Sequence, residues 1–240
     1  MIITKTPYRI SFFGGGSDYP SWYKKFGGSV LSTTIDKYIY ISCRELPPFF
    51  DHKYRIVWSK IENVKKINEI KHLTVRKLIK YNKIRSGLEI HYDGDLPARS
   101  GMGSSSSFSV GLMRALNYHQ HRDIKGINLA YKTIIFEQKI MKETVGSQDQ
   151  VAASVGGFNK INFFKNDKIL IKKILSNNLK KLNSNLLLLY TGIQRNAATV
   201  ANNYVHKLSN QKEKNIRSII RKVDIGEKII QTGNLDDFGE

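Results

Sequence analysis

The sequence predicts an α+β protein, because strand-like segments fill its first third and helical patterns follow them. β-Branched and aromatic residues dominate residues 8–13, 29–35 and 37–43, as is typical of strands. From Ser104 to Tyr118 the apolar residues recur at helical spacing. Strands that are grouped ahead of helices indicate the α+β class.

Further elements are expected in the first half of the chain. Residues 29–35 and 37–43 flank Asp36, and this arrangement suggests a hairpin. Residues 62–83 carry apolar side chains at near-helical spacing and are expected to form an amphipathic helix. Residues 88–92 alternate between apolar and polar side chains, which predicts a half-buried strand ahead of a loop.

The second half is expected to continue with helices and then to return to strands. Asn128 can cap a second helix that runs to about Lys142. Residues 158–164 and 169–174 have strand composition, and the largely apolar run 185–190 is typical of a buried strand.

Composition and charge limit the classes of function. The 240 residues are enough for one large domain or two modest ones, and 39 basic against 20 acidic residues give a net charge of +19. Such an excess favours nucleic acid, anionic lipid or a phosphorylated small molecule as partner. The basic residues are dispersed along the chain, so nucleic acid is not the expected partner. A single cysteine, Cys43, and no membrane-spanning or signal pattern favour the cytoplasm.

The strongest motif is the glycine- and serine-rich segment 96–107, which links the strand at 88–92 to the helix that follows. Glycines let backbone amides approach an anion, and serines at a helix start add donors where the helix dipole is positive. Polyphosphate suits such a loop, although a well-capped helix explains the composition equally well. The segment matches neither the P-loop nor the Rossmann pattern.

Two further segments carry residues suited to phosphoryl transfer. Glu137 and Asp149 lie 12 residues apart; a helical carboxylate can hold Mg²⁺, and a second one can accept a hydroxyl proton. Taken alone, both are ordinary surface acids. In residues 7–20, Arg9 could steady phosphoryl charge and Asp18 could bind a polyol, or they are a surface arginine and a turn aspartate.

Taken in this order, the three segments resemble the motifs of the GHMP small-molecule kinases, which include galactokinase and homoserine, mevalonate and phosphomevalonate kinases. Residues 7–20 resemble the first motif of the family, residues 96–107 its glycine–serine ATP loop, and residues 146–150 its catalytic-aspartate segment. Residues 9–16, 30–38 and 146–150 are most similar to the D-glycero-D-manno-heptose 7-phosphate kinases.

The resemblance implies a fold and a domain division. An N-terminal ATP-binding domain of the ribosomal protein S5 domain 2-like type is expected over residues 1–165, and the start of a ferredoxin-like C-terminal domain over residues 166–240. The glycine-rich third motif of the family has no counterpart after Gly192. The second domain is therefore expected to be truncated.

The resemblance also implies a reaction, in which ATP and Mg²⁺ phosphorylate the anomeric hydroxyl of heptose 7-phosphate to the 1,7-bisphosphate for nucleotide-activated heptose synthesis. Asp149 would act as the base and Arg9 would assist the phosphoryl group, while Ser105 and Glu137 would hold Mg²⁺. The residues expected to bind ATP are Pro97, Gly101, Met102, Gly103, Ser104, Ser105 and Ser106, and those expected to bind the sugar are Asp18, Gly15, Gly16 and Asp36.

Two alternatives remain open within this resemblance. One is a GHMP kinase for another sugar, fucose- or galactose-like, and the other is a truncated, non-catalytic homologue that binds nucleotide. The expected partners are a sugar phosphate and ATP, with a homodimer as a further possibility and neither nucleic acid nor membrane. Arg195 is a weaker candidate for contact with a substrate phosphate.

Overall fold

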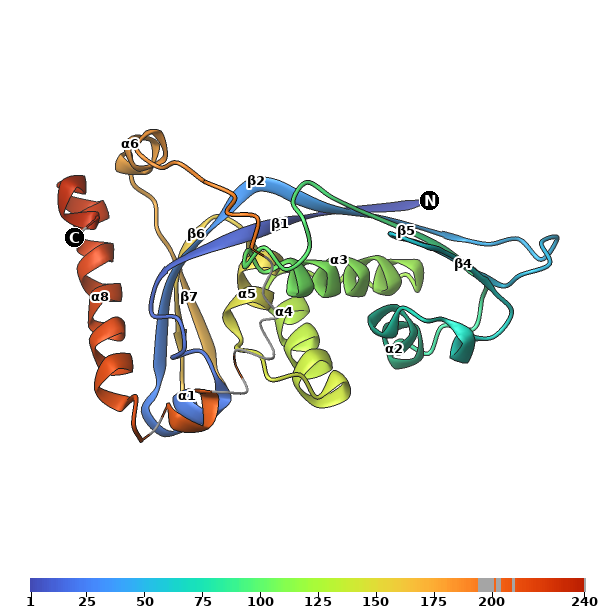
Figure 1. Cartoon of the computed structure of the whole chain (residues 1–240), viewed down its shortest axis with the longest axis horizontal. Helices are drawn as coiled ribbons and strands as arrows, with labels where there is room; N and C mark the ends of the chain where they lie inside the picture. Colours follow the sequence, from blue (N-terminus) through green and yellow to red (C-terminus); the bar gives the residue numbers. More distant parts are fainter. Residues whose placement is uncertain (194–200, 202–203, 209, 240) are drawn as a thin grey trace. The chain divides into compact units, whose positions relative to one another are not determined.

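The computed structural model describes residues 1–193, 201, 204–208 and 210–239 (Figure 1). Two compact units are interleaved along the chain. Unit 1 comprises Met1–Tyr8, Ile35–Glu143 and Asp149–Val155, and unit 2 comprises Arg9–Thr34, Thr144–Gln148 and Gly156–Glu240. The interleaving arises because two long strands, β1 (Ile2–Phe13) and β2 (Gly28–Glu45), contribute to both units.

The strands of unit 1 follow the order β4–β3–β5–β2, with β1 also paired to β2. The second half of β2 runs antiparallel to β5 (Leu88–Gly94), which is parallel to β3 (Tyr54–Val57). β4 (Ile61–Val64) closes this edge by antiparallel pairing with β3. Inward-facing residues of these strands, among them Ile41, Ile56 and Ile90, enter the core of the unit.

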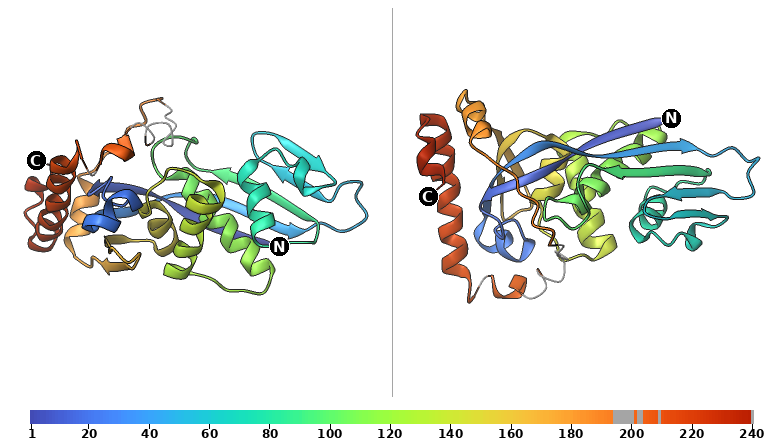
Figure 2. Two further views of the ribbon diagram at one scale, coloured as in Figure 1. Left: turned by 90° about the horizontal axis from the view of Figure 1, so that it is seen from below. Right: turned by 45° about the horizontal axis from the view of Figure 1, so that its top comes forward.

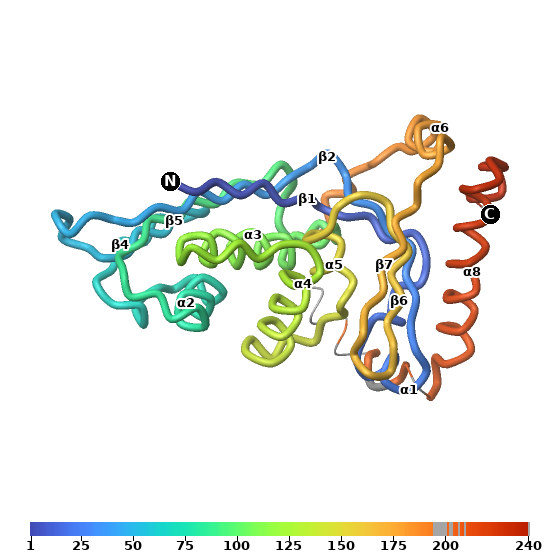
Figure 3. Tube along the Cα trace, turned by 180° about the vertical axis from the view of Figure 1, so that it is seen from behind, coloured from blue at the N-terminus to red at the C-terminus, as the bar shows by residue number. Residues whose placement is uncertain are grey.

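The helices of unit 1 lie on one side of these strands, as Figures 1 and 3 show. They are η1 (Ile67–Glu69), α2 (Leu73–Tyr81), α3 (Ser104–His119), α4 (Gly126–Ile135), the π-helical turn η2 (Phe136–Met141) and α5 (Gln148–Val155). α3 is buried along most of its length and is tied to β1 by hydrogen bonds from Ser107 Oγ to the Pro7 carbonyl (2.8 Å) and from Thr4 Oγ1 to the Gly111 carbonyl (3.2 Å). The start of α3 is therefore held firmly against the sheet.

Unit 2 contains the end of β1 and a set of antiparallel strands. The first half of β2 pairs with β6 (Phe158–Phe163), and β6 pairs with β7 (Ile169–Lys173). The helical segments are α1 (Pro20–Phe26), α6 (Asn178–Ser184), η3 (Val205–Lys207), α8 (Glu213–Thr232) and η4 (Leu235–Phe238). Figure 2 shows α8 alongside the strands, where Val223 and Ile230 join a core with Leu31 and the rings of Phe12, Phe13, Phe158 and Phe238.

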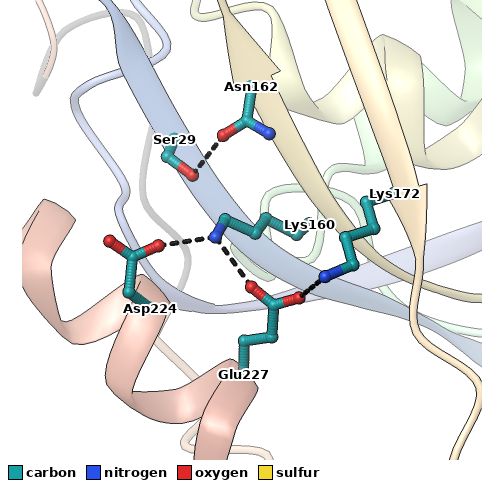
Figure 4. Close-up of polar contacts among 6 residues, drawn as sticks. All are labelled: Ser29, Lys160, Asn162, Lys172, Asp224 and Glu227. Atoms are coloured by element: carbon teal, nitrogen blue, oxygen red, sulfur yellow. Dashed lines mark hydrogen bonds and ion pairs between the residues drawn. The ribbon is translucent and has the colours of Figure 1, made fainter.

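Ion pairs reinforce the packing of α8 on this sheet (Figure 4). Lys160 of β6 pairs with Asp224 (2.5 Å) and with Glu227 (2.7 Å), and Lys172 of β7 pairs with the second oxygen of Glu227 (2.5 Å). Glu227 is buried, and its pKa is lowered: burial acts to raise it, but the two lysines more than offset that effect. Lys160 and Lys172 thus each have an acidic partner from α8.

Two expectations for the first half of the chain are wrong. Residues 29–43 form no hairpin at Asp36, because β2 is continuous and a lone aspartate without glycine or proline does not turn the chain. Only Leu73–Tyr81 of the expected helix 62–83 is α-helical. Residues 61–64 pair with β3 instead, and the buried Glu62 accepts hydrogen bonds from the Trp58 indole (2.9 Å) and the His72 amide (3.1 Å).

In the second half, the helix from Ser104 and the strands at 158–164 and 169–174 are confirmed within a residue or two. Asn128 does not cap α4, which begins at Gly126 after Lys125. The run 185–190 is not a strand, and Leu187 and Leu189 are 82% and 73% exposed. Its apolar composition suggested burial, but its side chains face solvent in the described part of the chain. Among the described residues, no helix is both long and apolar enough to cross a membrane.

Candidate functional site

The glycine–serine loop leads from β5 into the exposed start of α3. Arg99, Gly101 and Gly103 have left-handed backbone, and Gly103, at a φ of 76°, immediately precedes the helix. The first helical hydrogen bond runs from the Ser107 amide to the Gly103 carbonyl, so the preceding amides point out of the helix end. Pro97, Gly101 and Ser105 are exposed, while Met102, Gly103 and Ser104 are half-buried. Such an end can bind an anion.

Glu137 lies in the π-helical turn η2 and is 1% exposed. One carboxylate oxygen accepts hydrogen bonds from Ser106 Oγ (2.9 Å) and from the side-chain amide of Gln150. Burial raises the pKa of Glu137 to about 7, against the lowering effect of hydrogen bonds from Ser109, Gln150 and Ser106. Its second oxygen, Oε1, has no hydrogen-bond partner among the described residues.

This environment fits a magnesium ion. Mg²⁺ prefers oxygen ligands, takes one or two carboxylates from the protein and completes its shell with water and substrate phosphate. Glu137 Oε1 offers a buried carboxylate oxygen, and the serine hydroxyls at the start of α3 are further oxygen donors. The hydroxyl that contacts Glu137 belongs to Ser106, whereas Ser105 is exposed. In the described part of the chain, no three His, Cys, Asp or Glu side chains gather as a metal cluster.

Asp149 occupies the first turn of α5, half-buried, in unit 1. The next residue, Gln150, makes the hydrogen bond to Glu137. Unit 1 therefore gathers the start of α5, the buried carboxylate and the first turn of α3. The sequence did not predict Gln150 and Ser109 as partners of Glu137. Only the position of Gln150 beside Asp149, in residues 146–150, could have indicated it.

In unit 2, Asp18 is almost completely buried and organises the turn that follows β1. Its carboxylate oxygens accept hydrogen bonds from the Gly16 amide (3.1 Å) and the Gln148 amide (3.2 Å), and its carbonyl accepts one from the Ser147 amide (3.0 Å). A Cβ atom on Gly146 would lie 1.9 Å from Asp18 Oδ2, so only glycine fits there. Asp18 thus fixes the approach of the chain to α5.

The remaining candidates are distributed over both units. Arg9, half-buried on β1, and the turn residues Gly15 and Gly16 belong to unit 2. Asp36 belongs to unit 1, where it is exposed on β2. Arg195 lies outside the described residues.

These features define a class of protein. Residues 67–157 match the family model of the GHMP kinases N terminal domain, and this range includes the glycine–serine loop, Glu137 and Asp149. The chain has the GHMP kinase fold and carries a GHMP kinase N-terminal domain. The resemblance expected from the three motifs is confirmed.

Individual relatives are sugar and small-molecule kinases. The chain is 28% identical over 222 residues to the D-glycero-alpha-D-manno-heptose 7-phosphate kinase of Campylobacter jejuni, covering 88% of this chain and 66% of the relative. A D-glycero-D-manno-heptose 1-phosphate kinase from Bacteroides thetaiotaomicron superimposes with a TM-score of 0.72 at 23% identity, covering 100% of this chain and 80% of the other. A Streptococcus pneumoniae phosphomevalonate kinase, solved with phosphomevalonate and AMPPNP, gives a TM-score of 0.73 at 12% identity, covering 99% and 76%.

Proposed function

We propose that the chain is an ATP-dependent sugar kinase, or the part of one that binds nucleotide, with the anomeric hydroxyl of D-glycero-D-manno-heptose 7-phosphate as acceptor and the 1,7-bisphosphate as product. The observation that carries the proposal is the connection of Ser106, Glu137 and Gln150 in unit 1. It joins an anion-binding helix start, a buried carboxylate and the segment that bears Asp149. The name of the Campylobacter relative supports the choice of acceptor.

The nucleotide half of the proposed reaction belongs to unit 1. The backbone amides of Gly101, Met102 and Gly103 and the amides and hydroxyls of the serines 104–106 would hold the ATP phosphates, and Pro97 would line the same site without donating. Glu137, with Ser105 or Ser106, would hold Mg²⁺. When bound, Mg²⁺ neutralises charge on the transferring phosphoryl group.

In the acceptor half, Asp149 is the proposed base. The acceptor hydroxyl oxygen would form the new bond to the γ-phosphorus as the bond to ADP breaks, and its proton would pass to the Asp149 carboxylate. Arg9 would offset negative charge on the phosphoryl group. Asp18, Gly15, Gly16 and Asp36 are the proposed sugar contacts, and for the buried Asp18 we propose that it acts chiefly by holding the turn.

The remaining features of the proposal follow from the family resemblance. Residues 1–165 would form the ATP-binding domain, and residues 166–240 would begin the second domain. The packing units cross this division because β1 and β2 are shared. We further propose a cytoplasmic enzyme that acts on small molecules, with a homodimer as its assembly.

Calorimetric titration of this chain with Mg·ATP tests the proposal, with Glu137→Ala and, as a matched control, the exposed Glu45→Ala. We expect saturable binding that weakens about tenfold or more in Glu137→Ala and is unchanged in Glu45→Ala. Equal binding in all three proteins, or none in the wild type, would contradict a nucleotide site at Glu137. Substitution of heptose 7-phosphate by hexoses in an ADP-release assay then identifies the acceptor.

A further inference from the structure

A cavity lies within unit 2, formed by the end of α1, the start of β2, the end of β6 and the first half of α8. Its volume is about 720 Å³, which is in the range of small-molecule sites. Its walls include Trp22, Phe26, Asn162, Lys165, Arg217 and Arg221. None of these residues belongs to the proposed ATP loop or to the proposed acceptor site.

The charge of this cavity is positive. Lys165, Arg217 and Arg221 line it, and no carboxylate of the described residues does. Arg217 is paired with Glu213 (2.8 Å), which leaves two charges without an acidic partner in the described part of unit 2. Asp167, the acid nearest to Lys165 in sequence, is paired with Lys24 (2.9 Å). The cavity therefore has a net charge of about +2, counting its lining cations and Glu213.

On the neighbouring face of the sheet, in contrast to the cavity, the positive charges are neutralised. One turn further along α8, Asp224 and Glu227 neutralise Lys160 and Lys172 (Figure 4). α8 thus supplies acids where the strands present lysines, but it supplies arginines beside Lys165 and Asn162. Unneutralised arginine and lysine in a concave site favour an anionic ligand, and arginine binds phosphate with two parallel hydrogen bonds.

The wall beside Arg217 is aromatic. Trp22 is completely buried and packs on Phe26 with ring centroids 4.7 Å apart, and the Arg217 guanidinium lies 4.9 Å from the Phe26 ring. The indole Nε1–H of Trp22 has no acceptor among the described residues, which is a costly arrangement for a buried donor. An apolar wall beside cations suits a planar ring attached to an anionic group.

We propose that this cavity is a binding site for an organic phosphate monoester that carries an aromatic ring, of the nucleoside monophosphate type. The charge of about −2 on such a phosphate matches the cavity, and the ring would pack against the exposed part of Phe26, behind which Trp22 is buried. The cavity shares no residue with the glycine–serine loop, so the proposal does not depend on the kinase function.

The test uses AMP as the probe and the two tryptophans as reporters. In ¹⁵N-labelled protein, Trp22 and Trp58 each give one indole signal, which the Trp58→Phe variant assigns. We expect AMP to shift the Trp22 signal saturably, with weaker binding by ribose 5-phosphate, which lacks the ring, and by inorganic phosphate. No saturable shift of the Trp22 signal at millimolar AMP would overturn the proposal.

Charge variants locate the phosphate. The double variant Lys165→Ala/Arg221→Ala is expected to weaken AMP binding about tenfold or more. The matched control, Lys168→Ala/Lys214→Ala, keeps Lys165 and Arg221 and removes the same two charges at exposed residues of unit 2 outside the cavity. An equal loss in both double variants would indicate a general charge effect, and no loss in either would place AMP elsewhere; each result contradicts the site. Circular dichroism checks that every variant is folded.

Discussion

Ser106 and Glu137, 31 positions apart in the sequence, are joined by a hydrogen bond of 2.9 Å from the serine hydroxyl to the buried carboxylate. This bond ties the first turn of α3 to the π-helical turn η2. Single π-helical turns often occur at functional sites, and here one carries the candidate metal ligand. The geometry of the candidate anion-binding helix start and that of the carboxylate are therefore coupled.

Glu137 is expected to make the stability of the ligand-free protein fall as pH rises. Burial raises its pKa to about 7 from the ordinary value of 4.5, so the folded state binds this proton more tightly than the unfolded state does. The stabilisation is complete below pH 4.5 and is lost as pH rises through about 7, by about 3 kcal/mol in the limit. Urea unfolding of the wild type and of Glu137→Gln between pH 5 and pH 8 measures this loss of stability.

The comparison with Glu137→Gln is essential because His72 acts in the opposite direction. Burial lowers the pKa of His72, so its contribution to stability grows as pH rises toward 6.5. Both proteins contain His72, so its contribution cancels in the difference between their free energies of unfolding. A difference that does not change with pH would contradict the raised pKa of Glu137.

Ser106→Ala and Ser105→Ala should have different effects. Ser106→Ala removes a buried hydrogen bond to Glu137, and we expect a loss of about 1 kcal/mol in the free energy of unfolding. Ser105 is exposed, so Ser105→Ala should leave stability within about 0.5 kcal/mol of wild type. Thermal unfolding of both variants measures these losses, and its repetition with Mg·ATP shows which hydroxyl contributes to ligand binding. Equal destabilisation of the two ligand-free variants would contradict the hydrogen bond between Ser106 and Glu137.

Gly146→Ala should destabilise unit 2 severely. The new methyl group would lie 1.9 Å from the Asp18 carboxylate, which is buried and held by two backbone amides. We expect a loss of about 2 kcal/mol or more, since neither partner has room to move. Gly15→Ala is the control, because its Cβ would meet no atom closer than 4.0 Å. Similar unfolding midpoints for the two variants would be inconsistent with a close approach at Gly146.

The ion pairs of α8 predict an acid-sensitive contribution from Glu227. Its pKa is lowered, because the lysine hydrogen bonds outweigh burial, so its stabilisation is present above pH 4.5 and is lost as pH falls below that value. Glu227→Gln should cost about 1–3 kcal/mol at pH 7 and much less at pH 3. Glu213 forms a more exposed ion pair with Arg217 on the same helix, so Glu213→Gln should lower the free energy of unfolding by less than about 0.5 kcal/mol at either pH. A cost for Glu227→Gln that is the same at both pH values would count against these ion pairs.

Sequence patterns predict most of this fold where the pattern is local. The helix from Ser104 and the strand at 88–92 follow from side-chain periodicity alone. The patterns fail where distant partners decide the structure. Glu62 is buried by contacts with Trp58 and His72, and β2 runs straight through Asp36 because each half has its own partner strand.

In the candidate site, too, local motifs predict some of the residues, and the packing of distant segments determines the others. Short motifs single out the glycine–serine loop, Glu137 and Asp149, and the structure joins the first two through Ser106. The roles of Gln150 and Ser109 depend on how η2 and α5 pack against α3, which no spacing rule reports. The cavity beside Trp22 is built from four separate segments and leaves no motif in the sequence.

The most direct test of the kinase assignment is ³¹P NMR of this chain with Mg·ATP and heptose 7-phosphate, beside the Asp149→Ala variant. The account predicts a new anomeric phosphate signal that grows as ADP appears with the wild-type chain and is absent with Asp149→Ala. Phosphoryl transfer at the same rate in both proteins would contradict the account, and no transfer in the wild type while Mg·ATP is bound would contradict catalysis by this chain and leave it as the nucleotide-binding part.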